Sequence, residues 1–138
     1  MNSPILQIAS KYLKPILLFL GIIALLRGHN YPGGGFIGGL LTALSIVYIS
    51  LAFTSIETKN RLLIQPEHYI GVGLLLTLVS FLPSLLKSEP LMKGIWVTIK
   101  VPLINEVKLG TPFLFDIGVF LTVIGVTLMF LFTLSIKE

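Results

Sequence analysis

Residues 33–53 decide the fold, and they read GGGFIGGLLTALSIVYISLAF without a single charged side chain. As an α-helix this stretch is about 31 Å long, which matches the hydrocarbon core of a bilayer at about 30 Å. An uncharged run of this length predicts a transmembrane helix. The lipid bilayer is therefore the expected solvent for this part of the chain.

The composition extends this conclusion to the rest of the protein. Of the 138 residues, 54% are hydrophobic and 12% are charged, and the mean hydropathy is +0.96. Four spans of about 20 residues would use most of this length and leave no room for a folded enzyme domain outside the membrane. We expect an all-α membrane protein, a bundle of about four transmembrane helices, with no enzymatic activity of its own.

Three further spans are expected from the rest of the sequence. Pro66 and Glu67 suit the first turn of one helix, and Thr111 and Pro112 suit the N-cap and first turn of another. The remaining span lies near the N-terminus. The expected spans are 5–26, 33–53, 69–86 and 112–136, which form one transmembrane domain over residues 1–138 with a polar loop at 87–110.

The first span needs help from the residues before it. Its purely apolar part, 15–26, is about 18 Å long as a helix and cannot cross the bilayer alone. Just upstream, polar side chains recur on one helix face, namely Gln7, Ser10, Lys11 and Lys14. Two geometries fit: one long helix with its polar stripe toward a partner subunit, or an interfacial helix that bends at Pro15 into a short span.

The polar loop carries a strand pattern. Its apolar residues Ile95, Val97, Ile99 and Val101 alternate with others, and a second run follows at 106–109. This pattern predicts a small extramembrane β-hairpin between the third and fourth helices. Because an isolated hairpin is marginal in water, we expect it to lie on a neighbouring subunit.

Charge and cysteine content exclude several classes of site. The chain has no cysteine, and its net charge of +4 is scattered along the sequence, so we expect no thiolate site and no nucleic-acid partner. His29 and His68 fall on opposite sides of the membrane, so no metal site is expected, and no cofactor. Five basic residues fall on each side, so the positive-inside rule gives no orientation.

The densest motif is the segment GHNYPGGGFIGG at residues 28–39. It is no phosphate loop, because no strand precedes it and no Gly-Lys-Ser/Thr follows. Its glycines recur four apart, a spacing that lets helices approach closely, and a break before the helix would also expose positive N–H groups. The residues expected in helix packing or subunit contact are Pro32, Gly33, Gly34, Gly35, Phe36, Gly38, Gly39 and Gly118.

Asp116 lies inside the last predicted span, where a carboxylate is costly and is read as functional by default. The parity of the crossings places it at the same leaflet as Arg27 and His29. Asp116 either forms a static pair with one of these two or takes part in proton or ion transfer. The candidate ion-path residues are Asp116, His29 and Arg27, although a histidine beside a glycine turn is more often structural.

Two motifs carry a family resemblance. The segment 28–39 and the segment GTPFLFDIGV at 110–119 resemble the MnhB (MrpB) family of subunits of multisubunit Na⁺/H⁺ (cation/proton) antiporters. The resemblance implies an accessory subunit of a Na⁺/H⁺ antiporter complex in the cytoplasmic membrane, with cytoplasmic termini. It implies other membrane subunits and the lipid bilayer as partners, with Na⁺ and H⁺ handled by the complex. The short polar first span and the length of the stretch before Gly110 depart from the family pattern.

Three functional hypotheses remain open at this point. The chain is a transporter subunit whose Asp116 and His29 line an ion route, or an assembly subunit that only packs and seals larger subunits. The third is the equivalent membrane-arm subunit of a complex I-like membrane-bound hydrogenase or another redox-driven ion pump.

Overall fold

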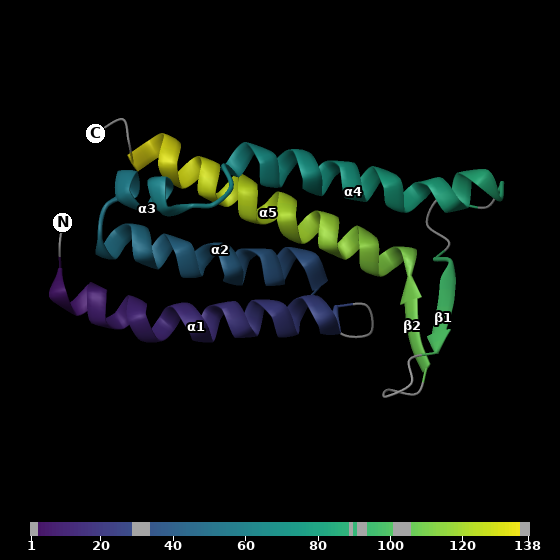
Figure 1. Cartoon of the computed structure of the whole chain (residues 1–138), viewed down its shortest axis with the longest axis horizontal. Helices are drawn as coiled ribbons and strands as arrows, with labels where there is room; N and C mark the ends of the chain where they lie inside the picture. The colour runs from purple at the N-terminus through teal and green to yellow at the C-terminus, as the bar shows by residue number, and fades with distance from the viewer. Residues whose placement is uncertain (1–2, 29–33, 89, 91–93, 101–105, 136–138) are drawn as a thin grey trace.

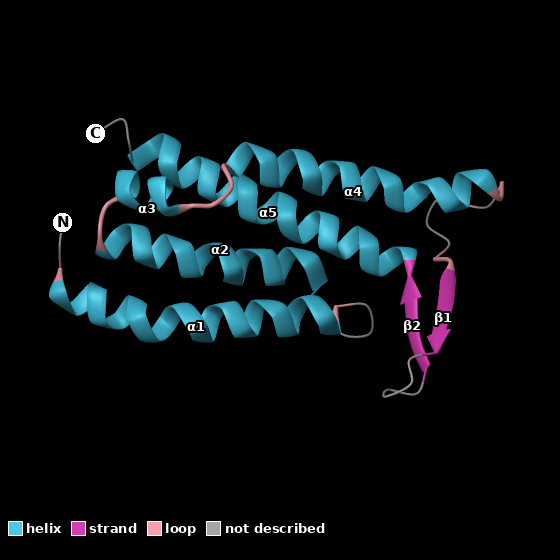
Figure 2. Ribbon diagram, viewed as in Figure 1, coloured by secondary structure: helices cyan, strands magenta, loops and turns pink. Residues whose placement is uncertain are grey.

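The computed structural model describes residues 3–28, 34–88, 90, 94–100 and 106–135. Four long helices dominate it: α1 (Pro4–Arg27), α2 (Gly34–Ala52), α4 (Pro66–Leu86) and α5 (Thr111–Ser135). A short helix, α3 (Ser55–Arg61), lies between α2 and α4 (Figure 1). Two short strands, β1 (Trp96–Lys100) and β2 (Glu106–Gly110), lie between α4 and α5 (Figure 2).

All four long helices are long and apolar enough to cross a membrane. The prediction of a helical membrane protein with about four spans is therefore confirmed. The observed α4 begins three residues earlier than the predicted span at 69–86, because Pro66 occupies the first helical turn with Glu67 beside it.

The first span is one long helix that continues through Pro15. The alternative of an interfacial helix bending at Pro15 into a separate short span is wrong. Part of the polar stripe turns inward, because Gln7 Nε2 donates to the Ala52 carbonyl at 3.5 Å and the buried Ser10 Oγ donates to the Gln7 carbonyl at 2.9 Å. The Gln7 bond ties the start of α1 to the end of α2, whereas the Ser10 bond lies within α1.

The long helices lie side by side in the order α1, α2, α5, α4 (Figure 1). The sequence predicts the number of these helices but does not specify this open row. The reason for the row lies in α2, whose glycines serve both of its sides: Gly38 meets the Gly21 carbonyl of α1, and Gly39 meets the Phe120 carbonyl of α5. The two broad faces of the row, and the outer faces of α1 and α4, are left for lipid or other subunits.

Backbones approach closely at each crossing between these helices. A Cβ at Gly38 would lie 2.6 Å from the Gly21 carbonyl oxygen, and one at Gly118 would lie 2.7 Å from the Gly73 carbonyl oxygen. Such distances leave no room for any side chain, and close approach through small residues is how helices associate in lipid.

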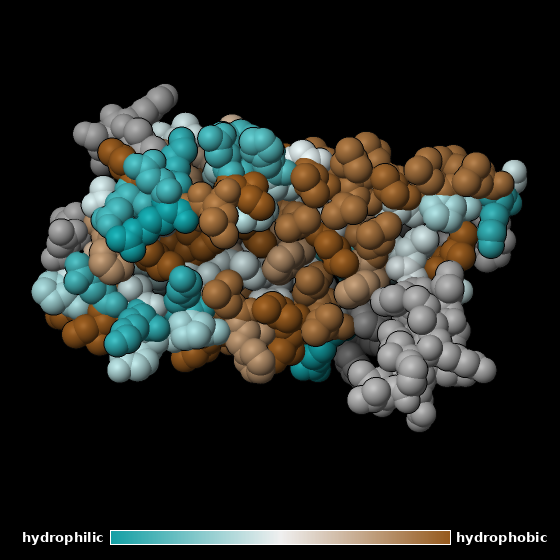
Figure 3. Space-filling model, in the orientation of Figure 1, coloured by the Kyte–Doolittle hydropathy of each residue, from teal (hydrophilic) through white to brown (hydrophobic). Residues whose placement is uncertain are grey.

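Few large apolar side chains are buried. The core is a small cluster of Ile124, Leu128 and Phe132 on α5, covered in part by Ile46 of α2 and Leu62 after α3. Many other large apolar side chains in the described helices are exposed, and Figure 3 shows a broad brown band on the visible face. In a bilayer this band faces lipid tails or neighbouring subunits.

The two strands form an antiparallel pair that runs into α5. Their register pairs Trp96 with Gly110 and Lys100 with Glu106. The Thr111 N–H donates to the Ile95 carbonyl at 3.1 Å, and the Ile95 N–H donates to Thr111 Oγ1 at 3.2 Å. The strands are thus fixed to the first residue of α5 at one end of the row.

The two ends of the helix row carry different elements. α1 begins and α5 ends beside α3, at the end where hydrophilic residues gather in Figure 3. At the opposite end α1 finishes, α2 and α5 begin, and the strands lie next to α5 (Figure 1). We call this opposite end the strand end.

Candidate functional site

At the strand end, the last residues of α1 meet the first residue of α2. A Cβ at Gly28 would collide with the Cα and N atoms of Gly34. Gly34 itself has a φ of +84°, in the left-handed region that L side chains rarely adopt. Position 34 therefore requires glycine on conformational grounds as well as for space.

The side chain of Asp116, from the second turn of α5, lies against this junction. Its Oδ1 and Oδ2 atoms are 3.5 Å and 3.6 Å from the position that a Cβ on Gly34 would occupy. The next glycine, Gly35, packs directly on the Asp116 carbonyl oxygen, and its Cβ position is 3.0 Å from the Phe120 backbone nitrogen. Both the carboxylate and the backbone of Asp116 are therefore placed by the first turn of α2.

The electrostatics of this arrangement are favourable. The N-terminus of a helix carries a partial positive charge of about half a unit, so a carboxylate beside the start of α2 is stabilised there. Arg27 lies in the last turn of α1, where the partial charge is negative and a cation is favoured. Asp116 is half-buried and Arg27 is exposed. The strand end thus places a half-buried carboxylate beside the positive end of α2.

Residues 5–129 match the family model described as a domain related to the MnhB subunit of Na⁺/H⁺ antiporters. The chain belongs to the MnhB family. A relative from Bacillus subtilis (strain 168), named as a Na(+)/H(+) antiporter subunit, is 34% identical over 137 residues, which cover 99% of this chain and 96% of the relative. The protein of the same name from Alkalihalophilus pseudofirmus is 31% identical, over 97% of this chain and 93% of its own length.

A solved structure has the same fold. The structure of the Mrp complex from Dietzia sp. DQ12-45-1b contains a chain that superposes on this one with a TM-score of 0.74 and 26% sequence identity. The match covers 98% of the present chain and 15% of the other chain. The present MnhB-family chain therefore corresponds in fold to a small part of a much longer chain.

The predicted ion-path residues are described only in part. Asp116 and Arg27 lie on helices at the strand end, whereas His29 lies outside the described residues. The structure tests neither the pairing of Asp116 with His29 nor an ion route through them. Pro32 and Gly33, expected in packing, also lie outside the described residues.

The remaining residues expected in packing differ in their surroundings. Gly34, Gly35 and Gly39 of α2 face α5, while Gly38 meets α1 on one side and the Phe120 ring on the other. Phe36 is 58% exposed and faces away from the described helices.

Gly118 packs on α4 and not on α2. A Cβ there would lie 2.6 Å from Thr77 Cγ2. The close contacts of these MnhB-family glycines, as far as the described residues show them, are between helices of the same chain.

The sequence reasoning did not single out three further glycines with the same role. Gly21 meets Thr42 of α2, Gly73 meets Thr122 of α5, and Gly125 lies 2.7 Å, at its Cβ position, from the Pro66 carbonyl oxygen. A spacing signal was available for one of them, because Gly118 and Gly125 are seven residues apart and fall on one helix face. Gly21 is the only glycine inside α1, although Gly28, directly after the helix, lies seven residues further on.

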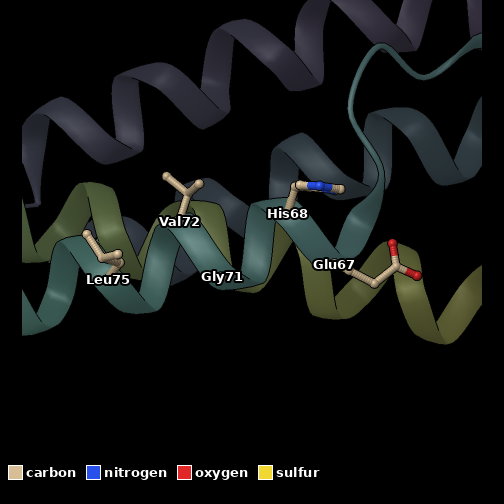
Figure 4. A pocket seen from close by; sticks show the side chains of 5 residues that line it. All are labelled: Glu67, His68, Gly71, Val72 and Leu75. Atoms are coloured by element: carbon tan, nitrogen blue, oxygen red, sulfur yellow. The ribbon is translucent and has the colours of Figure 1, made fainter.

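No group of three or more histidine, cysteine, aspartate or glutamate side chains that could hold a metal ion occurs in the described part of the chain. A shallow hollow lies on α4 near its start, lined by Glu67, His68, Gly71, Val72 and Leu75. In Figure 4 the side chains of His68 and Val72 point to one side of α4, and that of Glu67 points to the other. The hollow lies away from Asp116, near the level at which Pro66 packs on Gly125 of α5.

Proposed function

We propose that this chain is an accessory transmembrane subunit of a multisubunit Na⁺/H⁺ antiporter complex, contributing to cation/proton antiport and to assembly of the complex. The observation that carries the proposal is the end-to-end match to relatives named as Na(+)/H(+) antiporter subunits, at up to 34% identity. The proposal gives the chain no catalytic role and no cofactor of its own. Its partners are the other membrane subunits and the lipid bilayer.

Within this role, Asp116 is the proposed contact for a proton or cation, with Arg27 and His29 near the same leaflet. The support is the position of the carboxylate between α5 and the start of α2, with both oxygens toward Gly34. The positive end of the helix dipole favours a carboxylate at this place, and acidic residues inside transmembrane helices commonly mark ion or proton pathways. Na⁺ and H⁺ movement itself is proposed for the complex as a whole.

A purely structural role is the second candidate, because the glycine contacts fix the helices of this chain in a row whose broad apolar faces are left exposed. Gly35, Gly38 and Gly118 bring α1, α2, α5 and α4 into close backbone contact. In this second role, the chain would pack against larger channel subunits and take no part in ion transfer.

We place the chain in the cytoplasmic membrane as a multi-pass protein with cytoplasmic termini. The four apolar helices support a multi-pass protein, and the start of α1 and the end of α5 at one end of the row support termini on the same side. In this orientation the strand end and Asp116 are near the outer leaflet.

Recovery of the intact complex tests the proposed function. When the tagged full-length chain is purified from its native membrane in mild detergent, we expect other antiporter subunits to co-purify, identified by mass spectrometry. Recovery of iron–sulfur or nickel-containing subunits in their place would assign the chain to a hydrogenase or another redox-driven pump. Recovery of no other membrane subunit would contradict the proposal altogether.

A further inference from the structure

The closest contact between α1 and α2 is made by a small set of residues. A Cβ at Gly21 of α1 would lie against Thr42 Oγ1 and 2.9 Å from the Gly38 carbonyl oxygen of α2. In return, a Cβ at Gly38 would lie 2.6 Å from the Gly21 carbonyl oxygen and 3.1 Å from the Leu25 backbone nitrogen. One glycine of the outer helix therefore packs on a glycine and a threonine that lie one turn apart on the central helix.

The contact between α4 and α5 has the same arrangement. A Cβ at Gly73 of α4 would lie against Thr122 Oγ1 and 2.6 Å from the Gly118 carbonyl oxygen of α5. In return, a Cβ at Gly118 would lie 2.7 Å from the Gly73 carbonyl oxygen and 2.8 Å from the Thr77 backbone nitrogen. In both pairs, the last of these nitrogens belongs to the residue one turn after the glycine of the outer helix. The two contacts therefore correspond residue by residue.

The sequences of the two central helices carry the same pattern. α2 reads IGGLLT at residues 37–42 and α5 reads IGVFLT at residues 117–122, so isoleucine, glycine, leucine and threonine recur at equal spacing. The connections differ, because β1 and β2 lie only between α4 and α5. This insertion puts the two matches out of step along the chain, and the correspondence becomes visible in the helix contacts.

A half-turn relates the two helix pairs to each other. α1 and α4 are the outer helices of the row, and α2 and α5 are the central ones (Figure 1). Each outer helix runs antiparallel to its central helix. The contacts of Gly35 with Asp116 and of Gly39 with Phe120 show that α2 and α5 run parallel. A half-turn about an axis along the helices, between α2 and α5, therefore brings α1 onto α4 and α2 onto α5.

We infer that the chain consists of two copies of one helical hairpin unit, α1–α2 and α4–α5, and that the central helix of each unit is a pairing surface for a second copy of the unit. Internal repeats related by an axis along the membrane normal are one of the ways in which membrane transport proteins are built. In this chain both copies lie in one polypeptide, and their pairing surface is the contact between α2 and α5.

The two copies differ at the surface where they pair. Gly35 of α2 packs on α5, whereas the corresponding residue of α5 is Phe115. The residue that corresponds to Asp116 is Phe36, so the first unit forms the same helix contact without a carboxylate at this place. The carboxylate of Asp116 instead lies against Gly34 of the other unit. Asp116 is thus a feature of the contact between units and not of the hairpin itself.

Paired substitutions test whether the two hairpin contacts are equivalent. Gly21→Ala and Gly73→Ala should each lower the thermal unfolding midpoint of the purified full-length chain in detergent. Adding Thr42→Ala or Thr122→Ala, respectively, removes the hydroxyl that the new Cβ meets. The second substitution should restore about 3 °C or more of the lost midpoint in both hairpins.

Crossed combinations are the matched controls for these pairs. Gly21→Ala with Thr122→Ala, and Gly73→Ala with Thr42→Ala, place the two changes in different units, so their shifts should add. Restoration in neither hairpin or in only one, or equal restoration by the crossed pairs, would overturn the inference. All variants are compared as the isolated chain, so the result does not depend on the proposed antiporter role.

A circular permutant tests the pairing of the two units. When the chain is opened between Phe53 and Thr54 and Glu138 is joined to Met1 by a glycine–serine linker, the second unit precedes the first. The half-turn makes the old and new links equivalent, since each runs from the central helix of one unit toward the outer helix of the other. We expect this permutant to unfold cooperatively, with a midpoint within about 5 °C of that of the wild type.

A second permutant provides the comparison. Opened after Ser88 with the same linker, it separates α4 from α5 along the chain and therefore interrupts a unit. It should unfold at a lower temperature than the permutant opened between the units. A permutant opened at Phe53 that unfolds no higher than the one opened at Ser88, with a short and with a long linker, would overturn the inference.

Discussion

Replacing Gly35 with alanine should destabilise this chain by about 1–3 kcal/mol and reduce its recovery with the complex. The added Cβ would sit on the Asp116 carbonyl oxygen and 3.0 Å from the Phe120 backbone nitrogen, and neither backbone group can rotate away. The clash can be relieved only by separating α2 from α5. The measurement is the thermal unfolding midpoint of the purified chain in detergent, with the yield of assembled complex beside it.

Gly71 provides a matched control on α4. A Cβ at Gly71 would meet no atom within 4 Å, so Gly71→Ala adds helix propensity without a clash. We expect an unchanged or slightly raised unfolding midpoint for Gly71→Ala and a lowered one for Gly35→Ala. Equal midpoints for the two variants would show that the contact between α2 and α5 is not as close as described.

Asp116→Asn should reduce Na⁺-dependent proton transport by the complex at least about tenfold while the complex assembles normally. Asparagine keeps the shape of the side chain beside Gly34 and removes its ability to carry charge or take up a proton. If the carboxylate only stabilises the start of α2, its loss costs about 0.3–1 kcal/mol of stability and leaves transport intact. The two roles of Asp116 thus separate when transport and assembly are measured on the same preparation.

Glu67→Gln is the control for this experiment. Glu67 is an exposed acid in the first turn of α4, away from Asp116, and its neutralisation should leave transport unchanged. Full transport by the Asp116→Asn complex would contradict the ion-route role and favour the structural one.

The sequence predicted about four spans because the bilayer sets a minimum apolar length for a helix that crosses it. The signals are local: an uncharged run forms α2, and Pro66 and Thr111 mark helix starts. Tertiary packing does not override signals of this kind. The continuity of α1 through Pro15 was not decided by such signals. It is supported by the Gln7 side chain, which bonds to the Ala52 carbonyl at the end of α2, a contact between residues 45 apart in the sequence.

The sequence predicted which residues lie near the candidate site, but it did not predict their contacts. The parity of crossings placed Asp116 and Arg27 at one end, whereas the contact of the carboxylate with Gly34 follows from the parallel packing of α2 and α5. The open row of helices could not be predicted from the sequence either. Glycines four apart indicate close helix packing, but they do not specify which helix packs there. Gly118 illustrates this, since it packs on Gly73 of α4 and not on α2.

The most direct test of the central claim is antiport by the complete complex with and without this chain. Everted membrane vesicles from cells that lack their own Na⁺/H⁺ antiporters would be energised, and the collapse of the pH gradient on Na⁺ addition would be followed by a fluorescent probe. The account predicts a strong response with all subunits present and its loss when this chain alone is omitted, with recovery when it is supplied again. An equal response without the chain would contradict its assignment as a required subunit of the antiporter.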